Sequence, residues 1–310
     1  MSKIVIALGG NAMVRPGEAG GIEEQTANLS ASLTRIVELV GLGHQITITH
    51  GNGPQVGNLL IQQEAARRQV PSFPLDVSVA QTQGQIGYLI QNGLSAQLKK
   101  QGIDKPVTSL ITRVLVRESD PAFQNPSKPV GPFFSEEHAR ERMARGEDWI
   151  EDSGRGWRKV VPSPQPVEIV ELPIIKALAG RGAIVIAAGG GGIPVVERSG
   201  TLVGIEAVVD KDLTGCLLAA DLDADLMVIL TDVEKVALNF GTPNQIDLAQ
   251  ITLSEARNYQ KEGHFGAGSM GPKVEAACKF VEITGGRAII TSLDRVVGAV
   301  QGKAGTSIVR

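Results

Sequence analysis

Three lysines stand in surroundings that are unusual for a positive charge, and they are the best candidates for chemistry in this chain. Lys211 lies between two aspartates, Lys273 follows a Gly-Pro pair at the predicted start of a helix, and Lys128 stands between a serine and a proline. Most lysines are solvated surface charges, but a lysine at a helix N-terminus opposes the helix dipole unless it meets an anion. Phosphoryl transfer needs such cations, because its transition state spreads negative charge over the transferred oxygens. The pattern favours this chemistry, with Asp212 placed to orient the flanking ammonium groups.

Glycine clusters follow three apolar, β-branched runs. The clusters are Gly9-Gly10-Asn11, Gly51-Asn52-Gly53 and the glycines of 189–192. A buried strand that leads through glycines into a helix leaves backbone N–H groups at the helix N-terminus, where they and the helix dipole favour an anion. A single cluster is as often an ordinary tight turn. Three clusters that each follow a predicted strand favour a substrate with several anionic groups.

The predicted elements would bring these residues together. Apolar residues at helical spacing over 29–40 end at a glycine pair, Pro54 opens another helix, and a longer helix runs through 86–98. Further segments are predicted as strands at 107–116, 183–188, 226–230 and 288–291 and as helices at 169–179, 213–222 and 274–283. Apolar strands that alternate with helices predict an α/β fold, a three-layer α/β/α arrangement around a central, mainly parallel sheet. Ligands bind beyond the carboxyl ends of such strands, where the glycines lie.

One stretch, about 118–173, breaks this alternation. It holds eight of the 16 prolines and no strong strand pattern. Phe133, Phe134, Trp149 and Trp157 nevertheless supply enough apolar surface for a small packed unit, which we prefer to a disordered loop. We expect an inserted lid subdomain at about 118–166.

Composition excludes several classes of function. The 310 residues are 42% hydrophobic and 20% charged, which suits a globular protein of one large or two medium domains. A net charge of −3 and an aromatic content of 4% argue against a nucleic-acid partner. Cys216 and Cys278 lie in apolar helical patterns without disulfide or metal-site spacing, so we expect them in the core of a cytoplasmic protein. No targeting segment and no membrane-spanning run is apparent.

Several competing motifs are weaker. The chain lacks a P-loop signature, and the Gly-x-Gly-x-x-Gly match at 266–271 follows a charged helix end instead of a buried strand. The Gly51 cluster does follow a strand, so an NAD-dependent oxidoreductase stays an alternative, although Pro54 restricts the backbone there. A non-catalytic nucleotide sensor is another alternative, but it would not need three lysines. The acidic stretch 221–225 is interpreted as a turn, and the four histidines have no metal-ligand spacing. His50 could touch substrate or be a structural imidazole.

Longer motifs resemble the carbamate kinases, a family with the amino-acid kinase fold. The matching segments are 7–12, 49–57, 81–88, 125–129, 154–158, 161–164, 189–195, 210–213, 230–233 and 262–274. The resemblance covers the whole chain. In combination these motifs are specific to carbamate kinases, whereas the double-glycine loop alone would indicate only the wider fold.

The resemblance implies a phosphotransferase with a carboxyl acceptor, which moves a phosphoryl group reversibly between ATP and carbamate. Mg²⁺ would be held largely by the nucleotide phosphates. In the family the reaction often makes ATP from carbamoyl phosphate, in arginine or related nitrogen catabolism. The alternative is another acyl-phosphate-forming kinase of the same fold. The resemblance also implies a cytoplasmic homodimer whose lobe 1–205 binds carbamate or carbamoyl phosphate and whose lobe 206–310 binds ATP or ADP.

Site residues carry over by motif. The carbamoyl phosphate end would be held by Gly9, Gly10, Asn11, Gly51, Asn52 and Gly53. Lys211 and Lys273 would bridge the transferred phosphoryl group, Asp212 would orient them, and Lys128 would arrive from the lid. The nucleotide would be bordered by Thr231, Asp232, Val233, Gly268, Ser269 and Met270. The 189–192 loop would form part of the wall between acceptor and nucleotide.

Overall fold

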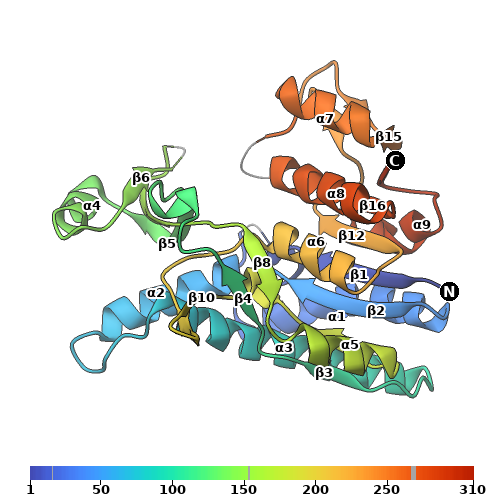
Figure 1. The fold of residues 1–310 in the computed structure, drawn as a ribbon, viewed down its shortest axis with the longest axis horizontal. Coiled ribbons are helices and arrows are strands. Elements are labelled where there is room, and N and C mark those ends of the chain that lie inside the picture. The colour runs from blue at the N-terminus through green and yellow to red at the C-terminus, as the bar shows by residue number, and fades with distance from the viewer. Residues whose placement is uncertain (16, 153, 267–269) are drawn as a thin grey trace.

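A computed structural model describes residues 1–15, 17–152, 154–266 and 270–310 of the chain (Figure 1). Its centre is an eight-stranded sheet in the order β15-β17-β16-β12-β1-β2-β9-β3. The bounds are β1 Lys3–Leu8, β2 Gln45–His50, β3 Val107–Ser109, β9 Ile184–Ile186, β12 Leu226–Thr231, β15 Gln250–Thr252, β16 Arg287–Ser292 and β17 Thr306–Val309. All neighbouring pairs are parallel except β16 with β17. The predicted mainly parallel sheet is confirmed.

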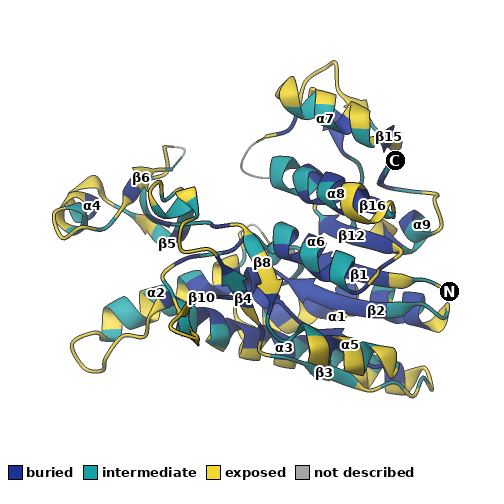
Figure 2. Cartoon of the chain, viewed as in Figure 1, coloured by how far each residue is buried: buried dark blue, intermediate teal, exposed yellow. Residues whose placement is uncertain are grey.

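Side chains alternate between the two faces of this sheet and belong to two separate hydrophobic cores, one on each face. In β1, Ile4, Ile6 and Leu8 pack on one face with helices α1 (Ile22–Gly41), α3 (Leu75–Lys100) and α9 (Val296–Val300). Val5 points to the other face, which is covered by α5 (Leu172–Gly180), α6 (Lys211–Asp221) and α8 (Met270–Thr284). Burial on both faces explains why the strands are almost continuously apolar. Figure 2 shows the buried strands between partly exposed helices, as a three-layer fold requires.

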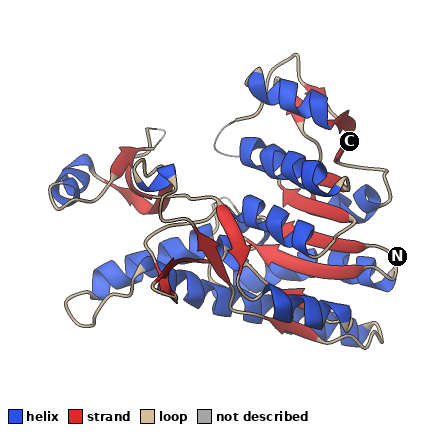
Figure 3. Cartoon of the chain, in the orientation of Figure 1, coloured by secondary structure: helices blue, strands red, loops and turns tan. Residues whose placement is uncertain are grey.

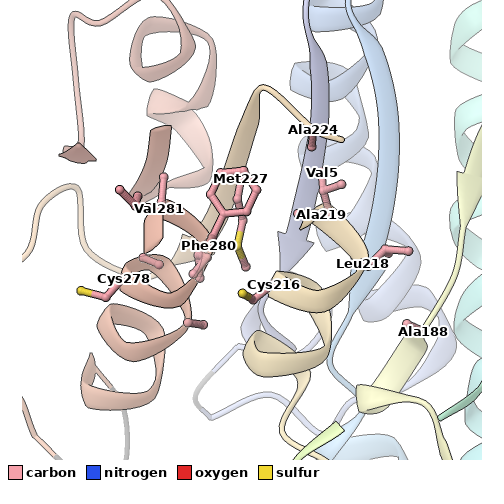
Figure 4. Packing of buried hydrophobic residues seen from close by; sticks show 14 of the residues in the cluster. Val5, Ala188, Cys216, Leu218, Ala219, Ala224, Met227, Cys278, Phe280 and Val281 are labelled. Atoms are coloured by element: carbon pink, nitrogen blue, oxygen red, sulfur yellow. The ribbon is translucent and has the colours of Figure 1, made fainter. Parts of the chain in front are cut away.

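The second of these cores contains both cysteines. Cys216 on α6, Met227 on β12 and Phe280 on α8 belong to one buried cluster (Figure 4). Burial raises the pKa of Cys216 to about 12 and that of Cys278 to about 11. Both thiols are therefore protonated at neutral pH and serve as small apolar side chains, which confirms their predicted place in the core.

The predicted strand at 107–116 is wrong, because the segment forms two strands in two sheets. β3 extends the central sheet beside β9, whereas β4 (Arg113–Val116) belongs to a four-stranded sheet in the order β11-β10-β4-β8. The break falls at Thr112, whose N–H donates to the side chain of Gln83 on α3 instead of to a strand. The other strands are β8 (Pro166–Ile169), β10 (Ile193–Arg198) and β11 (Thr201–Gly204).

The inserted stretch is a packed unit, as expected, but it does contain strands. β5 (Lys128–Phe134), β7 (Trp157–Val161) and β6 (Trp149–Glu151) form an antiparallel sheet with helix α4 (Glu136–Met143). Phe134 stacks on His138 at 4.4 Å between ring centroids, and Trp149 meets Phe134 edge-on at 5.3 Å. This short sheet is held by a few aromatic residues, so no alternating apolar pattern marks it in the sequence. Figure 1 shows the lid projecting from the main body.

The remaining described elements are small or peripheral. Helix α2 (Gly53–Ala66) contacts β5 of the lid, and α7 (Leu253–Lys261) packs on α8. β13 (Ala237–Leu238) and β14 (Ile246–Asp247) form a hairpin, and single 3₁₀ turns lie at η1 (Gly10–Ala12), η2 (Pro121–Phe123), η3 (Gly189–Gly191) and η4 (Leu293–Arg295). None of the helices in the described part of the chain is long and apolar enough to cross a membrane.

Candidate active site

The candidate site lies along the carboxyl edge of the central sheet. Leu8 pairs with His50 in parallel strands, and Thr231 pairs with Ser292, so the loops that follow β1, β2, β12 and β16 leave the same edge. The arrowheads of these strands point towards the lid (Figure 3). The sheet order places the loop after β12 next to that after β1, followed by those after β2 and β9.

The three glycine clusters are followed by different elements of secondary structure. Only Gly51-Asn52-Gly53 leads directly into an α-helix, α2, where Pro54 stands in the first turn as predicted. Gly9 precedes the single turn η1, and the glycines after β9 form the turn η3 and then enter strand β10. The prediction that each cluster leads from a strand into a helix is therefore wrong for two of them, and only the second cluster ends at the dipole of a long helix.

The loop Gly189–Gly191 allows neighbouring segments of the chain to pack closely against it. Its carbonyl oxygens are already used: the side chain of Gln83 donates to Gly189 O and Thr214 Oγ1 donates to Gly191 O, both at 2.9 Å. A Cβ atom on Gly190 would collide with the Asn52 side chain, and one on Gly191 would collide with the backbone of Val209. Glycine is needed here so that the second cluster and the segment before α6 can approach this loop.

A compact lysine–aspartate cluster stands in front of these loops. Lys211 Nζ donates to Asp212 Oδ1 at 2.5 Å, and Lys273 Nζ lies 3.5 Å from Asp212 Oδ2. Lys211 and Asp212 occupy the first turn of α6, while Lys273 is in the first turn of α8, which packs against α6. The Asp212 side chain is only 4% exposed. One buried carboxylate thus holds two ammonium groups on either side of itself, which compensates its burial.

Asp210 links this cluster to the lid. Its Oδ1 accepts the N–H of Asp212 and caps α6, while its Oδ2 receives Lys128 Nζ at 2.8 Å. Lys128 begins β5 of the lid. Burial by itself would raise the pKa of Asp210, but Lys128, the backbone bond and Lys211 together hold it below its usual range. Asp210 is therefore ionised at neutral pH and ties the predicted third lysine to the other two.

Gly51 makes room for the stem of Lys211. A Cβ atom on Gly51 would lie 3.1 Å from Lys211 Cδ and 3.3 Å from the backbone nitrogen of Gly10. Behind it, the buried ring of His50 contacts the Gly51 carbonyl through Nδ1 at 3.0 Å and lies against Gly189. Burial, helped by the charge of Lys211, lowers the pKa of His50 to about 4 against the hydrogen bond to Gly51. His50 is thus neutral and structural in this structure.

The other predicted site residues lie in the loops after β1, β2 and β12, at the start of α8, or outside the described residues. Gly10 lies against Pro54, and Asn52 is buried and donates to Thr82 Oγ1 at 2.9 Å. Gly9 lies at the opening of η1, and Gly53 begins α2 in an exposed position. Thr231 ends β12, Asp232 and Val233 follow it, and Met270 begins α8. Gly268 and Ser269 lie outside the described residues, as does the side chain of Asn11.

Two contributors were missed at the level of sequence. Asp210 was considered only as a neighbour of Lys211, although an aspartate immediately before a helix is a common N-cap and could have marked it. Gln83 connects Thr112 and Gly189 across 29 and 106 residues of chain, and no local pattern points to such a bond.

The described side chains include no group of three or more His, Cys, Asp or Glu that could hold a metal ion. Asp210 and Asp212 are the acidic groups nearest the lysines, and their oxygens are already engaged by ammonium and backbone N–H groups. A cation at this site would therefore have to arrive with most of its ligands supplied by the substrate.

Comparisons with known proteins agree on one family. Residues 2–292 match the amino acid kinase family. The chain is 52% identical to a carbamate kinase of Thermococcus kodakarensis over 100% of both chains, and 48% identical to carbamate kinase 2 of Enterococcus faecalis over 99% of both. Among solved structures, the carbamate kinase of Giardia lamblia bound to AMP-PNP is 43% identical, with a TM-score of 0.95 over 99% of this chain and 98% of that one.

Proposed function

The chain belongs to the amino acid kinase family and within it to the carbamate kinases, and we propose that Lys211 and Lys273 are the cations of its phosphoryl transfer. The enzyme moves a phosphoryl group between ATP and carbamate. The single observation that carries the assignment of these residues is the pair of ammonium groups held by the buried carboxylate of Asp212.

The reaction makes specific demands on this pair. As the phosphoryl group leaves one oxygen and joins another, its equatorial oxygens carry the developing charge. Lys211 and Lys273 stabilise that charge, and Asp212 fixes their separation so that no reorganisation is needed during transfer. Asp212 is a positioning residue in this scheme, because its oxygens are occupied by the two lysines.

We assign the two substrates to neighbouring loops of the sheet edge. The carbamoyl phosphate end belongs to Gly9, Gly10 and Asn11 after β1 and to Gly51, Asn52 and Gly53 after β2. The nucleotide end belongs to Thr231, Asp232, Val233, Gly268, Ser269 and Met270. Support comes from the sheet order, since β12 lies beside β1 and β1 beside β2. The lobes 1–205 and 206–310 would then each contribute one substrate site, and the Gly189–Gly191 loop braces the acceptor side.

The lid contributes Lys128 to the carbamoyl phosphate end of the site. The ion pair of Lys128 with Asp210 holds the base of β5 next to α6, which gives the lid a fixed attachment beside the lysine cluster. Mg²⁺ is the expected cofactor, and the described residues fit an ion held by nucleotide phosphates and water more than one held by a protein cage. When bound, such an ion neutralises phosphate charge.

We further propose a homodimer that works in the cytoplasm, chiefly in the direction of ATP synthesis from carbamoyl phosphate in arginine or related nitrogen catabolism. The edge strand β3 pairs only with β9 in the described sheet. Beside it Tyr88 and Ile111 are 64% and 50% exposed and line a shallow hollow. Two exposed apolar side chains among polar neighbours, beside an unpaired sheet edge, are suited to contact with a second copy.

The direct test mixes the purified protein with Mg-ADP and carbamoyl phosphate and follows ATP. We expect ATP formation well above the buffer rate, and acetyl phosphate should be a far poorer donor. Absence of ATP, or an equal rate with acetyl phosphate, would remove the assignment.

The lysine roles have a separate test. Lys211→Ala and Lys273→Ala should each lower kcat by about a hundredfold or more with little change in the circular dichroism spectrum. Lys303→Met, an exposed lysine far along the chain, is the matched control and should leave kcat unchanged. Normal turnover in either of the first two variants would exclude that residue from the transition state.

A further inference from the structure

A cavity of about 220 Å³ lies at the edge of the central sheet opposite to the lysine cluster. It is bounded by the amino ends of β1 and β2 and by the C-terminal ends of α5 and α6. Val5 and Ala224, which Figure 4 shows near each other, are among its apolar lining residues. Since the carbamate kinase reaction is assigned to the carboxyl edge, this cavity has no part in it.

Thr47 supplies a hydroxyl group to the lining of the cavity. It lies in β2 between Ile46 and Ile48, whose side chains enter the α1/α3 core, so the Thr47 side chain projects to the other face, where the cavity lies. Thr47 is only 5% exposed, and its hydroxyl is not one of the fully enclosed polar atoms without a partner among the described residues. The hydroxyl therefore borders the cavity, where a ligand can reach it.

The charges around the cavity are of both signs. Lys3, Lys176 and Asp223 all line it, and in the described part of the chain none of them has an ion-pair partner within 4 Å. Of the neighbouring acidic groups, Asp225 accepts the backbone N–H of Lys3. Asp221 is close enough to feel the charges of Lys176, Glu168 and Asp223, although it forms no ion pair with Lys176 within 4 Å. The last turns of α5 and α6 add carbonyl dipoles, which favour a cation on their side.

We propose that this cavity binds a small α-amino acid with an apolar side chain. The ligand carboxylate pairs with Lys3 and Lys176, its ammonium group faces Asp223 and the helix ends, and Thr47 completes the polar contacts. A zwitterion can pair with both the two ammonium groups and the carboxylate at once. The apolar lining and a volume below that of a drug-sized pocket suit a side chain such as that of valine.

The test is isothermal titration calorimetry of the full chain with L-valine and its two half-analogues, isovalerate and isobutylamine. L-valine should bind once per chain, and each half-analogue should bind roughly tenfold more weakly or worse, because one charged contact is lost. Thr47→Val, Lys176→Met and Asp223→Asn should each weaken valine by about tenfold, while Lys303→Met should not. Asn tolerates the left-handed backbone that Asp223 adopts, so that variant keeps the turn.

The outcomes decide the proposal without reference to enzyme activity. Absence of binding by L-alanine, L-valine and L-leucine up to about 10 mM overturns it. Equal binding of isovalerate and valine rejects the zwitterion, and binding that is displaced by AMP-PNP or carbamoyl phosphate would place the ligand in the active site instead. If Thr47→Val fails to fold, the exposed Lys176→Met variant still decides whether the site is this one.

Discussion

At the level of single residues, the proposed active site depends on the carboxylate of Asp212 and on the absence of a side chain at Gly51. Asp212 gathers two lysines from two helices, and Gly51 leaves the space through which the stem of Lys211 passes. Both features concern the position of an ammonium group and not its presence. Small displacements of a charged group should therefore reduce catalysis strongly.

Gly51→Ala tests this directly. The added methyl group would lie 3.1 Å from Lys211 Cδ, so the lysine must shift by a few tenths of an ångström or more. We expect kcat to fall by about ten- to a hundredfold, because misplacement of reacting groups is costly. The midpoint of thermal unfolding should fall only slightly, since the methyl group also meets the backbone nitrogen of Gly10 at 3.3 Å. Gly21→Ala, where a Cβ meets nothing within 4 Å, is the control. Full activity of Gly51→Ala would show that the position of the Lys211 stem does not matter.

His50 gives a prediction on pH. Burial lowers its pKa to about 4 from the usual 6.5, so between these two pH values the unfolded chain binds a proton that the folded chain does not bind. Stability is therefore complete above pH 6.5 and falls as the pH drops towards 4, by about 3 kcal/mol in all.

Urea unfolding at pH 7 and pH 4.5 measures this loss. The variant His50→Gln cannot titrate, so its stability should change less between the two pH values than that of the wild type. Equal losses in the two proteins would assign the acid sensitivity to other groups, such as the carboxylates.

At the level of elements, the turn between β9 and β10 joins the two halves of the site. Gly191 has a φ of +90°, and a Cβ there would strike the carbonyl of Val209, two residues before Lys211. Thr214 on α6 fastens the same glycine through its carbonyl oxygen. The loop thereby fixes where α6 begins, and with it the lysine–aspartate cluster.

Gly191→Ala should destabilise the protein by about 3 kcal/mol or more, since backbone strain and a collision act together. Gly200 has a similar φ of +76° but nothing within 4 Å of its Cβ position. Gly200→Ala should therefore lose only about 1 kcal/mol, from the backbone alone. Urea midpoints of the two variants measure the difference, and equal losses would mean that the close approach to Val209 carries no energy.

At the scale of the whole molecule, the central sheet ends at β3 on one side and at β15 on the other. The proposed dimer uses the β3 edge, where Ile111 and Tyr88 are exposed. Ile111→Asp should convert the dimer to a monomer, because a carboxylate would be buried without a partner in the interface. Ile283→Asp, at a still more exposed position on α8, should not. Sedimentation velocity distinguishes the two, and a dimer that survives Ile111→Asp would place the contact elsewhere.

Much of this molecule could be predicted from local patterns. Continuous apolar runs predicted the strands of the parallel sheet, because burial on both faces leaves an apolar signal at every position of a strand. Apolar residues three or four positions apart predicted most of the helices. The pattern failed at 107–116, where the chain changes sheets at Thr112, and in the lid, whose strands pack around a few aromatic residues. Neither event leaves a period in the sequence.

The sequence by itself determined the fold class, the family and the types of residue available for phosphoryl transfer, since these depend on composition, period and contiguous motifs. Only the tertiary structure decided that Asp212 holds Lys211 and Lys273 together, that Asp210 receives Lys128, and that Gly51 admits a lysine stem. It also showed that the third glycine cluster packs and does not begin a helix. The ion pair of Lys128 with Asp210 joins residues 82 positions apart, and Gly51 and Lys211 are farther apart still. Contacts at such separations are fixed by how the helices pack on the sheet and not by any neighbour along the chain.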